Sequence, residues 1–303
     1  MRVLVTGAAG CIGSNLAKRL TAEGHQAVAL DDFSSANWVN LKDFRGDVLT
    51  CDLAGDLGSL RAQPPFEVVF HQASITDTTV ADSRKMMQHN VEGFRNLLNL
   101  AAAWQSRLIW ASSCSVYGQG AVPMKESQKP DPLNVYAFSK MVMEALAADY
   151  QPRLKWPAIG LRYSNVYGPG EAHKGRFASM IYQLARQMRA GSRPRIFHHG
   201  QQRRDFVYVQ DVLQANLKAM TAKGGGVFNV GYGEAFSFNE VVERLNHILK
   251  TNLPPDYFEN PYSFTQDWTQ TDLTDARRVL GYEPKYDLGK GIEAYYASGH
   301  LGT

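Results

Sequence analysis

The chain has 303 residues, a formal net charge of +3 and an apolar fraction of 44%. This length and composition exclude a disordered chain and allow one large domain or two smaller ones. The near balance of charge argues against nucleic acid as a partner. No stretch approaches the roughly 20 apolar residues of a membrane-spanning helix, so no membrane partner is expected.

Three cysteines, Cys11, Cys51 and Cys114, lie far apart and lack the paired spacing of a metal site. Such a set indicates reduced thiols. The apolar run at the N-terminus is too short for the core of a signal peptide. We therefore expect a cytoplasmic protein without a bound metal.

The first predicted strand, residues 2–6, leads into a glycine-rich stretch and a predicted helix over residues 12–23. Gly7 permits a tight turn, Gly10 permits close approach of the backbone to a pyrophosphate, and Gly13 permits close packing of the helix on the sheet. The free N–H groups and positive dipole end of the helix favour phosphate binding. The spacing GxxGxxG resembles that of the short-chain dehydrogenase superfamily.

A second predicted strand, residues 27–30, ends at Asp31 and Asp32. An acid at this position binds the ribose hydroxyls of an adenosine dinucleotide. The order strand, glycine turn, helix, strand and acid predicts a dinucleotide site rather than a glycine turn without a ligand.

Strands and helices continue to alternate along the chain, which predicts an α/β protein with a Rossmann-type, doubly wound parallel sheet. Its ligands should bind at the C-terminal ends of the strands. We expect a cofactor domain over residues 1–165, to which residues 204–235 return, and a smaller, discontinuous C-terminal substrate domain over residues 166–203 and 236–303. The further predicted strands are 68–71, 108–111, 158–162 and 227–230, and the further predicted helices are 86–103 and 133–150.

Tyr136 and Lys140 form a YxxxK pattern within a predicted helix, where residues four apart share a face. An ammonium beside the phenol would lower its pKa and let the tyrosine act as a base in alcohol oxidation. A hydroxyl from Ser112 or Ser113, at the end of the preceding strand, would bind the reacting oxygen. Alone, the pattern also fits a packing tyrosine; together with the glycine loop it predicts a dehydrogenase-type site.

These motifs and the stretch SSCSVYG at residues 112–118 resemble the nucleotide-sugar epimerase/dehydratase group of the extended short-chain dehydrogenases. The resemblance covers nearly the whole chain and implies an NAD(P)-dependent isomerase, a nucleotide-diphosphate sugar as substrate and a homo-oligomer. It implies that Ser113 is the catalytic hydroxyl, Tyr136 the base and Lys140 its helper, with Ser115 bonding the substrate and Asn90 near the cofactor ribose. The other residues expected at the cofactor are Cys11, Ile12, Gln72, Ala73, Ser74 and Val166.

The run NVYGP…ExHKG at residues 165–175, with RRDFVYV at residues 203–209, is similar to ADP-L-glycero-D-manno-heptose 6-epimerases, enzymes of lipopolysaccharide biosynthesis. The resemblance implies oxidation at C6 to a ketone and re-reduction on the opposite face. Tyr136 would then serve one orientation of the alcohol and Lys174 the other. A solvated surface lysine and a ligand of the diphosphate are the alternatives for Lys174.

The same reading places Asn165 at substrate hydroxyls and Arg204 at the diphosphate, which a guanidinium binds well. An ion pair with Asp205 or another acid is the alternative for Arg204. One departure from the family lies in the stretch FHHG at residues 197–200, and it leaves the nucleotide and the sugar open. The remaining residues expected at the substrate are Arg176, Gln183 and Phe197.

Two carboxylates, Asp31 and Asp32, disfavour a 2′-phosphate, and Asn37 stands where NADP-using relatives carry a lysine. NAD is therefore the expected cofactor and NADP the alternative. The main alternative function is a UDP-hexose 4-epimerase, which needs no second base. A 4,6-dehydratase, a net dehydrogenase and a non-catalytic NAD-binding protein are further alternatives.

Overall fold

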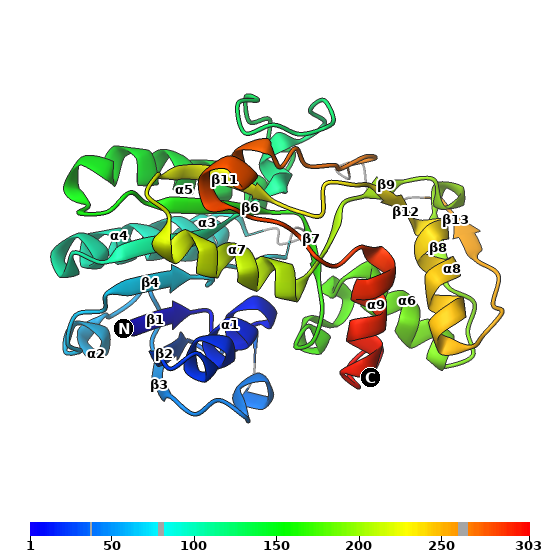
Figure 1. The fold of residues 1–303 in the computed structure, drawn as a ribbon, viewed down its shortest axis with the longest axis horizontal. Helices are drawn as coiled ribbons and strands as arrows, with labels where there is room; N and C mark the ends of the chain where they lie inside the picture. The colour runs from blue at the N-terminus through cyan, green and yellow to red at the C-terminus, as the bar shows by residue number, and fades with distance from the viewer. Residues whose placement is uncertain (37, 78–81, 260–265) are drawn as a thin grey trace.

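Seven parallel strands form the central sheet of the computed structural model, which describes residues 1–36, 38–77, 82–259 and 266–303 (Figure 1). Their order across the sheet is β11-β6-β5-β4-β1-β2-β3. From β1, the sequence order runs to one edge through β2 and β3 and to the other edge through β4, β5, β6 and β11. The α/β, Rossmann-type prediction is therefore confirmed. The strands are β1 (Arg2–Thr6), β2 (Gln26–Asp31), β3 (Asp47–Thr50), β4 (Val68–His71), β5 (Arg107–Ser113), β6 (Ile159–Tyr163) and β11 (Gly226–Val230).

Both faces of this sheet are buried, as a parallel sheet requires. Successive residues of β1 point to opposite faces: Val3 and Val5 belong to one hydrophobic cluster and Leu4 to another. Helices α1 (Cys11–Ala22) and α7 (Val209–Thr221) cover the first face. The second is covered by α3 (Ser83–Met87), α4 (Gly93–Trp104) and α5 (Val135–Tyr150) (Figure 1).

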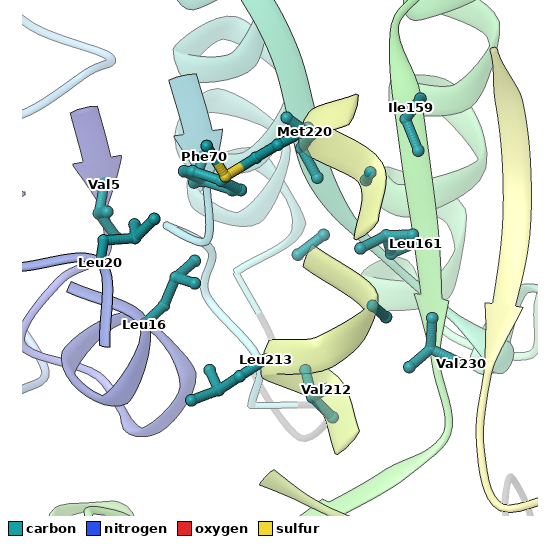
Figure 2. Packing of buried hydrophobic residues seen from close by; sticks show 14 of the residues in the cluster. Val5, Leu16, Leu20, Phe70, Ile159, Leu161, Val212, Leu213, Met220 and Val230 are labelled. Atoms are coloured by element: carbon teal, nitrogen blue, oxygen red, sulfur yellow. The ribbon is translucent and has the colours of Figure 1, made fainter. Parts of the chain in front are cut away.

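Figure 2 shows how α7 completes the first cluster. Its side chains Val212, Leu213 and Met220 lie between those of α1 and those of β6 and β11. The late residues Leu273 and Tyr282 belong to the same cluster. The core around the glycine loop is therefore built from chain segments nearly 280 residues apart.

The predicted helix over residues 86–103 begins earlier, at Ser83, because Asp82 accepts a hydrogen bond from the backbone N–H of Lys85 (2.9 Å). A π-helical turn, η2 (Gln88–Glu92), separates α3 from α4. The strand β3 was not predicted, because its four residues lie at the edge of the sheet and are only half-buried or exposed.

A second group of elements packs around a third hydrophobic cluster (Figure 1). Its helices are α6 (Met180–Arg189), α8 (Phe238–Leu249) and α9 (Leu288–Ala297). Short strands pair here: β7 (Asn165–Tyr167) with β10 (Phe206–Tyr208), β8 (Arg195–Phe197) with β13 (Asp256–Phe258), and β9 (Arg203–Arg204) with β12 (Phe236–Ser237).

The remaining elements are short. They are α2 (Gly58–Arg61), the 3₁₀ turns η1 (Trp38–Leu41), η3 (Cys114–Tyr117), η4 (Gln151–Arg153), η5 (Ala172–Phe177) and η6 (His198–Gly200), and the π turn η7 (Ala276–Leu280). Within the described ranges, no helix combines the length and the apolar character that crossing a membrane needs.

Candidate active site

A cleft of about 910 Å³ lies at the C-terminal ends of β1, β2 and β4. The turn η5 contributes His173, Lys174 and Phe177 to one wall. Among the predicted cofactor residues, ten line the cleft: Gly7, Gly10, Cys11, Ile12, Gly13, Asp31, Asp32, Gln72, Ala73 and Ser74.

The glycine loop leaves no room for side chains. Gly7 has a φ of +63°, and a Cβ atom there would lie 2.5 Å from the backbone nitrogen of Ala73. A Cβ atom on Gly13 would lie 2.1 Å from the carbonyl oxygen of Gly7. The bare backbone in front of α1 therefore fits a dinucleotide pyrophosphate, which needs close approach to main-chain N–H groups.

Asp31 holds the glycine loop from the end of β2. One carboxylate oxygen accepts from the backbone N–H of Ala9 (2.8 Å) and the other from that of Phe33 (2.9 Å). Burial raises the pKa of this carboxyl, and the two backbone hydrogen bonds oppose the rise.

Asp32 lines the cleft. A carboxylate oxygen of Asp32, a carboxylate oxygen of Asp52 and a ring nitrogen of His89 all lie within 4.8 Å of one another. Asp52 and His89 also line the cleft and were missed from the sequence. The cleft lining therefore carries three carboxylates beyond the predicted two, those of Asp52, Asp77 and Asp82, and Asp52 beside Asp32 disfavours a 2′-phosphate further. Asn37 lies outside the described residues.

The predicted catalytic residues meet where β5 ends beside α5. The ammonium of Lys140 lies 5.7 Å from the centroid of the Tyr136 ring and donates to the carbonyl of Ala111 (2.8 Å). The Ser113 hydroxyl accepts from the N–H of Ser115 (3.1 Å) and also bonds Tyr136. The three groups are thus brought together, although none of them lines the cleft.

The expected lowering of the Tyr136 pKa by Lys140 was wrong for this arrangement. Burial raises the pKa of the phenol, and the hydrogen bond from Ser113 opposes the rise. Burial also lowers the pKa of Lys140 to about 7, while the charge of Glu144 opposes this. The lowered pKa of Lys140 reduces the positive charge available to stabilise a phenolate.

Two further predicted residues differ in their hydrogen bonds. The Ser115 hydroxyl is buried, lies outside the cleft lining and has no hydrogen-bond partner within the described ranges. Asn90 is fully buried and also outside the cleft lining. Its amide bonds both the N–H (2.8 Å) and the carbonyl (3.1 Å) of Ile75 and the hydroxyl of Ser139 (3.0 Å), so it fixes a residue of the cleft wall.

Lys174 lies in the cleft because its segment packs onto the glycine loop. Asn15 donates to the carbonyl of Pro169 (2.8 Å), and Asn40 donates to the carbonyls of Ala9 (2.8 Å) and Gly170 (2.9 Å). His173 Nδ1 lies 2.9 Å from the Gly170 carbonyl.

The neighbours of Lys174 are placed differently. Arg176 is exposed and lies over the ring of Phe177, 4.7 Å from its centroid. Gln183 donates to the carbonyls of Arg176 (3.1 Å) and Ala178 (2.7 Å). Val166, in β7, is half-buried and packs against two of the hydrophobic clusters. Neither Arg176, Gln183 nor Val166 lines the cleft.

Arg204 forms no ion pair with Asp205. The buried Asp205 carboxylate instead accepts from the N–H groups of Tyr232 (2.7 Å), Gly233 (3.1 Å) and Thr271 (3.0 Å). Arg204 donates to two backbone carbonyls and forms no ion pair with any residue the structure describes. Burial lowers its pKa to about 10, partly offset by Asp267.

Asn165 and Phe197 lie on the second group of elements. The Asn165 amide nitrogen is 3.2 Å from both the carbonyl of Asp205 and the hydroxyl of Thr269. Phe197 packs edge-on against Phe258, with ring centroids 4.6 Å apart. Both residues lie beyond the lining of the cleft described above.

Comparison with known proteins gives one family and close relatives. The NAD dependent epimerase/dehydratase family matches residues 3–231. The chain is 34% identical to the ADP-L-glycero-D-manno-heptose-6-epimerase of Brachyspira hyodysenteriae, over 97% of this chain and 96% of that protein.

Two solved structures extend the likeness. The ADP-L-glycero-D-manno-heptose-6-epimerase of Helicobacter pylori has a TM-score of 0.93 and 39% identity, and the match covers 99% of this chain and 96% of that one. The UDP-glucose 4-epimerase of Thermotoga maritima, solved with UDP-glucose, has a TM-score of 0.89 and 28% identity, and the match covers 99% of both chains.

Proposed function

Because this chain belongs to the NAD dependent epimerase/dehydratase family, we propose that it is a nucleotide-sugar epimerase acting on C6 of ADP-glycero-manno-heptose. The observation that carries the choice of sugar is the likeness to two heptose epimerases at 34% and 39% identity over nearly the full length. The identity to the UDP-glucose 4-epimerase is lower, 28%.

The oxidation half of the reaction belongs to Ser113, Tyr136 and Lys140. The Ser113 hydroxyl orients the substrate alcohol, and the Tyr136 phenolate removes its proton while hydride leaves the same carbon. Burial disfavours the phenolate, and the hydrogen bond from Ser113 supports it. We assign to the Lys140 ammonium, 5.7 Å from the centroid of the Tyr136 ring, the supply of positive charge beside the phenolate when substrate is bound. Ser115 offers its unpartnered hydroxyl to the sugar.

Re-reduction of the ketone needs a proton donor at the new position of the alcohol oxygen. Inverting one centre through a ketone requires hydride to reach the opposite face, so the alcohol oxygen then points elsewhere. Lys174 is the base we assign to that second orientation, since it is the lysine of the HKG element and lines the cleft. Its ammonium protonates the oxygen as the alcohol is restored.

NAD fits the cleft through the glycine loop and the acids that follow β2. The backbone around Gly7 and Gly13 receives the pyrophosphate, and Asp31 and Asp32 receive the adenosine ribose. When bound, the nicotinamide accepts a hydride and gives it back, so that the overall reaction is redox-neutral. The carboxylates of Asp32 and Asp52 favour NAD over NADP.

We assign the diphosphate to Arg204, whose guanidinium forms no ion pair within the described ranges. Asn165, Arg176, Gln183 and Phe197 are the further substrate residues we propose.

We also propose that the enzyme acts in the cytoplasm and that it is a homo-oligomer. Cell fractionation tests the first assignment, and sedimentation of the purified chain tests the second.

NMR of the purified chain with ADP-D-glycero-D-manno-heptose tests this function. Conversion to the L-glycero epimer without net formation of NADH is the expected result. No conversion of the heptose, together with interconversion of UDP-glucose and UDP-galactose, would establish the alternative 4-epimerase, to which the Thermotoga structure points. Net NADH formation would indicate a dehydrogenase.

A further inference from the structure

A buried carboxylate, Glu144, lies four residues after Lys140 on the same face of α5. Its Oε1 accepts from the Ser112 hydroxyl (2.6 Å) and from Nε of Arg162 (2.8 Å), and its Oε2 accepts from Nη2 of Arg162 (2.6 Å). The side chains of Arg162 and Glu144 are only 5% and 11% exposed. This is a two-pronged, desolvated ion pair rather than a surface contact.

The partners of Glu144 lead directly to the reacting groups. Ser112 precedes Ser113 in β5, so its bond to α5 fixes the end of that strand against the helix that carries Tyr136. Arg162, in β6, also lies over the ring of Tyr117, 4.7 Å from its centroid. One carboxylate therefore joins β5, β6 and α5 at the level of the catalytic groups.

Glu144 also has an electrostatic effect on the site. Lys140 is fully buried, and Glu144 is the charge that opposes the loss of its proton. The Lys140 ammonium donates its hydrogen bond to the carbonyl of Ala111, which carries no net charge.

We propose that Glu144 is a positioning residue, which holds Ser113 against Tyr136 through Ser112 and Arg162 and keeps Lys140 charged. This inference rests on the proposed oxidation half-reaction but not on the identity of the sugar, because any substrate of this site must be oxidised by the same three residues. Within the described residues Glu144 forms no hydrogen bond or ion pair with Tyr136 or Ser113, so it acts through its partners.

The test compares the pH dependence of hydride transfer in four proteins. Glu144→Gln alone leaves the buried Arg162 unpaired and can unfold the chain, so the main variant is Glu144→Gln combined with Arg162→Met, which removes both charges. Glu144→Asp keeps the charge on a shorter side chain. Glu92→Gln is the control, since Glu92 is exposed and pairs with Arg95 on the surface (3.1 Å).

The readout is single-turnover reduction of bound nicotinamide, followed by absorbance from mildly acidic to alkaline pH. We expect the double variant to lose its rate at a lower pH than the wild type, by up to about one unit. Loss of the Glu144 charge lets Lys140 deprotonate sooner, and loss of the Arg162 charge offsets this only in part, since Glu144 is the group that raises the pKa of Lys140. We also expect a fall in its maximum rate of about tenfold or more from misplacement of the reacting groups. Glu144→Asp should keep the wild-type pH limb at a reduced rate, and Glu92→Gln should match the wild type.

A uniform fall in rate with an unchanged pH limb would overturn the proposal, since it would show a purely structural role. NMR titration of the lysine side chains gives the Lys140 protonation without turnover, and an unchanged titration would overturn it too. Each protein is tested with ADP-heptose and with UDP-glucose. If the wild type reacts only with UDP-glucose, the proposed function fails while the test of Glu144 still stands.

Discussion

The side chain of Asn40 donates to the carbonyl of Gly170, 130 residues later in the chain, at 2.9 Å. The same nitrogen donates to the carbonyl of Ala9, so the glycine loop and the segment that carries Lys174 are joined by one amide. We therefore expect release of a dinucleotide from the cleft to be coupled to movement of this segment.

Replacement of Asn40 by alanine tests that coupling. Loss of two hydrogen bonds of about 1 kcal/mol each should speed dissociation of NAD roughly tenfold or more. Stopped-flow measurement of NAD release checks this, with Asn99→Ala as control, because Asn99 is an exposed residue that bonds Tyr150 away from the cleft. An unchanged release rate would show that the segment does not retain the cofactor.

Substitution of Lys174 and substitution of Tyr136 should each slow the oxidation of a different heptose epimer. If each serves one orientation of the alcohol, Lys174→Met still allows one heptose epimer to reduce the bound nicotinamide and slows the other about 10²-fold or more, whereas Tyr136→Phe shows the reverse. Single-turnover absorbance with each pure epimer measures both rates.

The control for Lys174 is Lys129→Met, which alters an exposed lysine outside the cleft. Wild-type rates with both epimers would make Lys174 a solvated surface residue. A raised KM for both epimers without loss of either half-reaction would make it a ligand of the diphosphate.

Arg204→Met should weaken binding of the nucleotide sugar more than it slows turnover. Loss of a charge-assisted contact worth roughly 1.5–3 kcal/mol raises KM by about 10- to 100-fold. Steady-state kinetics and titration with ADP measure this. Arg278→Met, which breaks an exposed pair with Asp275, is the matched control; an Arg204 variant as competent as this control would remove Arg204 from the substrate site.

His71 should make the free energy of unfolding depend on pH. Burial, and then the charge of Lys140, lowers its pKa to about 3 from 6.5. Between these values the unfolded chain binds a proton that the folded protein does not. Stability therefore falls as pH decreases below about 6.5, by up to about 1.4 kcal/mol per pH unit.

Urea unfolding at several pH values, in the wild type and in His71→Asn, measures this contribution. The variant should lose that part of the slope, because it has no imidazole to protonate. His300→Asn changes an exposed histidine and should keep the slope. Equal slopes in all three proteins would mean that His71 is protonated in the folded state.

The order of elements around the glycine loop could be predicted from the sequence because each signal is local. Gly7, Gly13 and Asp31 lie within about 25 residues of one another, and the strands are short apolar runs. The pairing of Asn40 with Gly170 could not be predicted in this way, since nothing in the sequence near residue 40 marks its partner. The same holds for Glu144. In the sequence it is one more acid on a predicted helix, and only the packing of β6 beside α5 pairs it with Arg162.

The predicted lowering of the Tyr136 pKa was wrong for a related reason. Helical spacing correctly brings Tyr136 and Lys140 to one face, but it does not give the depth of burial. Burial decides the direction of both pKa shifts here. Such a balance depends on the packing of segments distant in sequence.

The placement of β11 and of residues 273–282 has a consequence for synthesis of the chain. β11 pairs with β6, and Leu273 and Tyr282 pack in the same cluster as β1. A nascent polypeptide therefore carries the whole glycine loop on the ribosome long before it can close the core beneath that loop. Until residues 273–282 have been made, we expect apolar surface of β6 and α7 to be open to chaperones, and NAD binding can stabilise the fold only after that point.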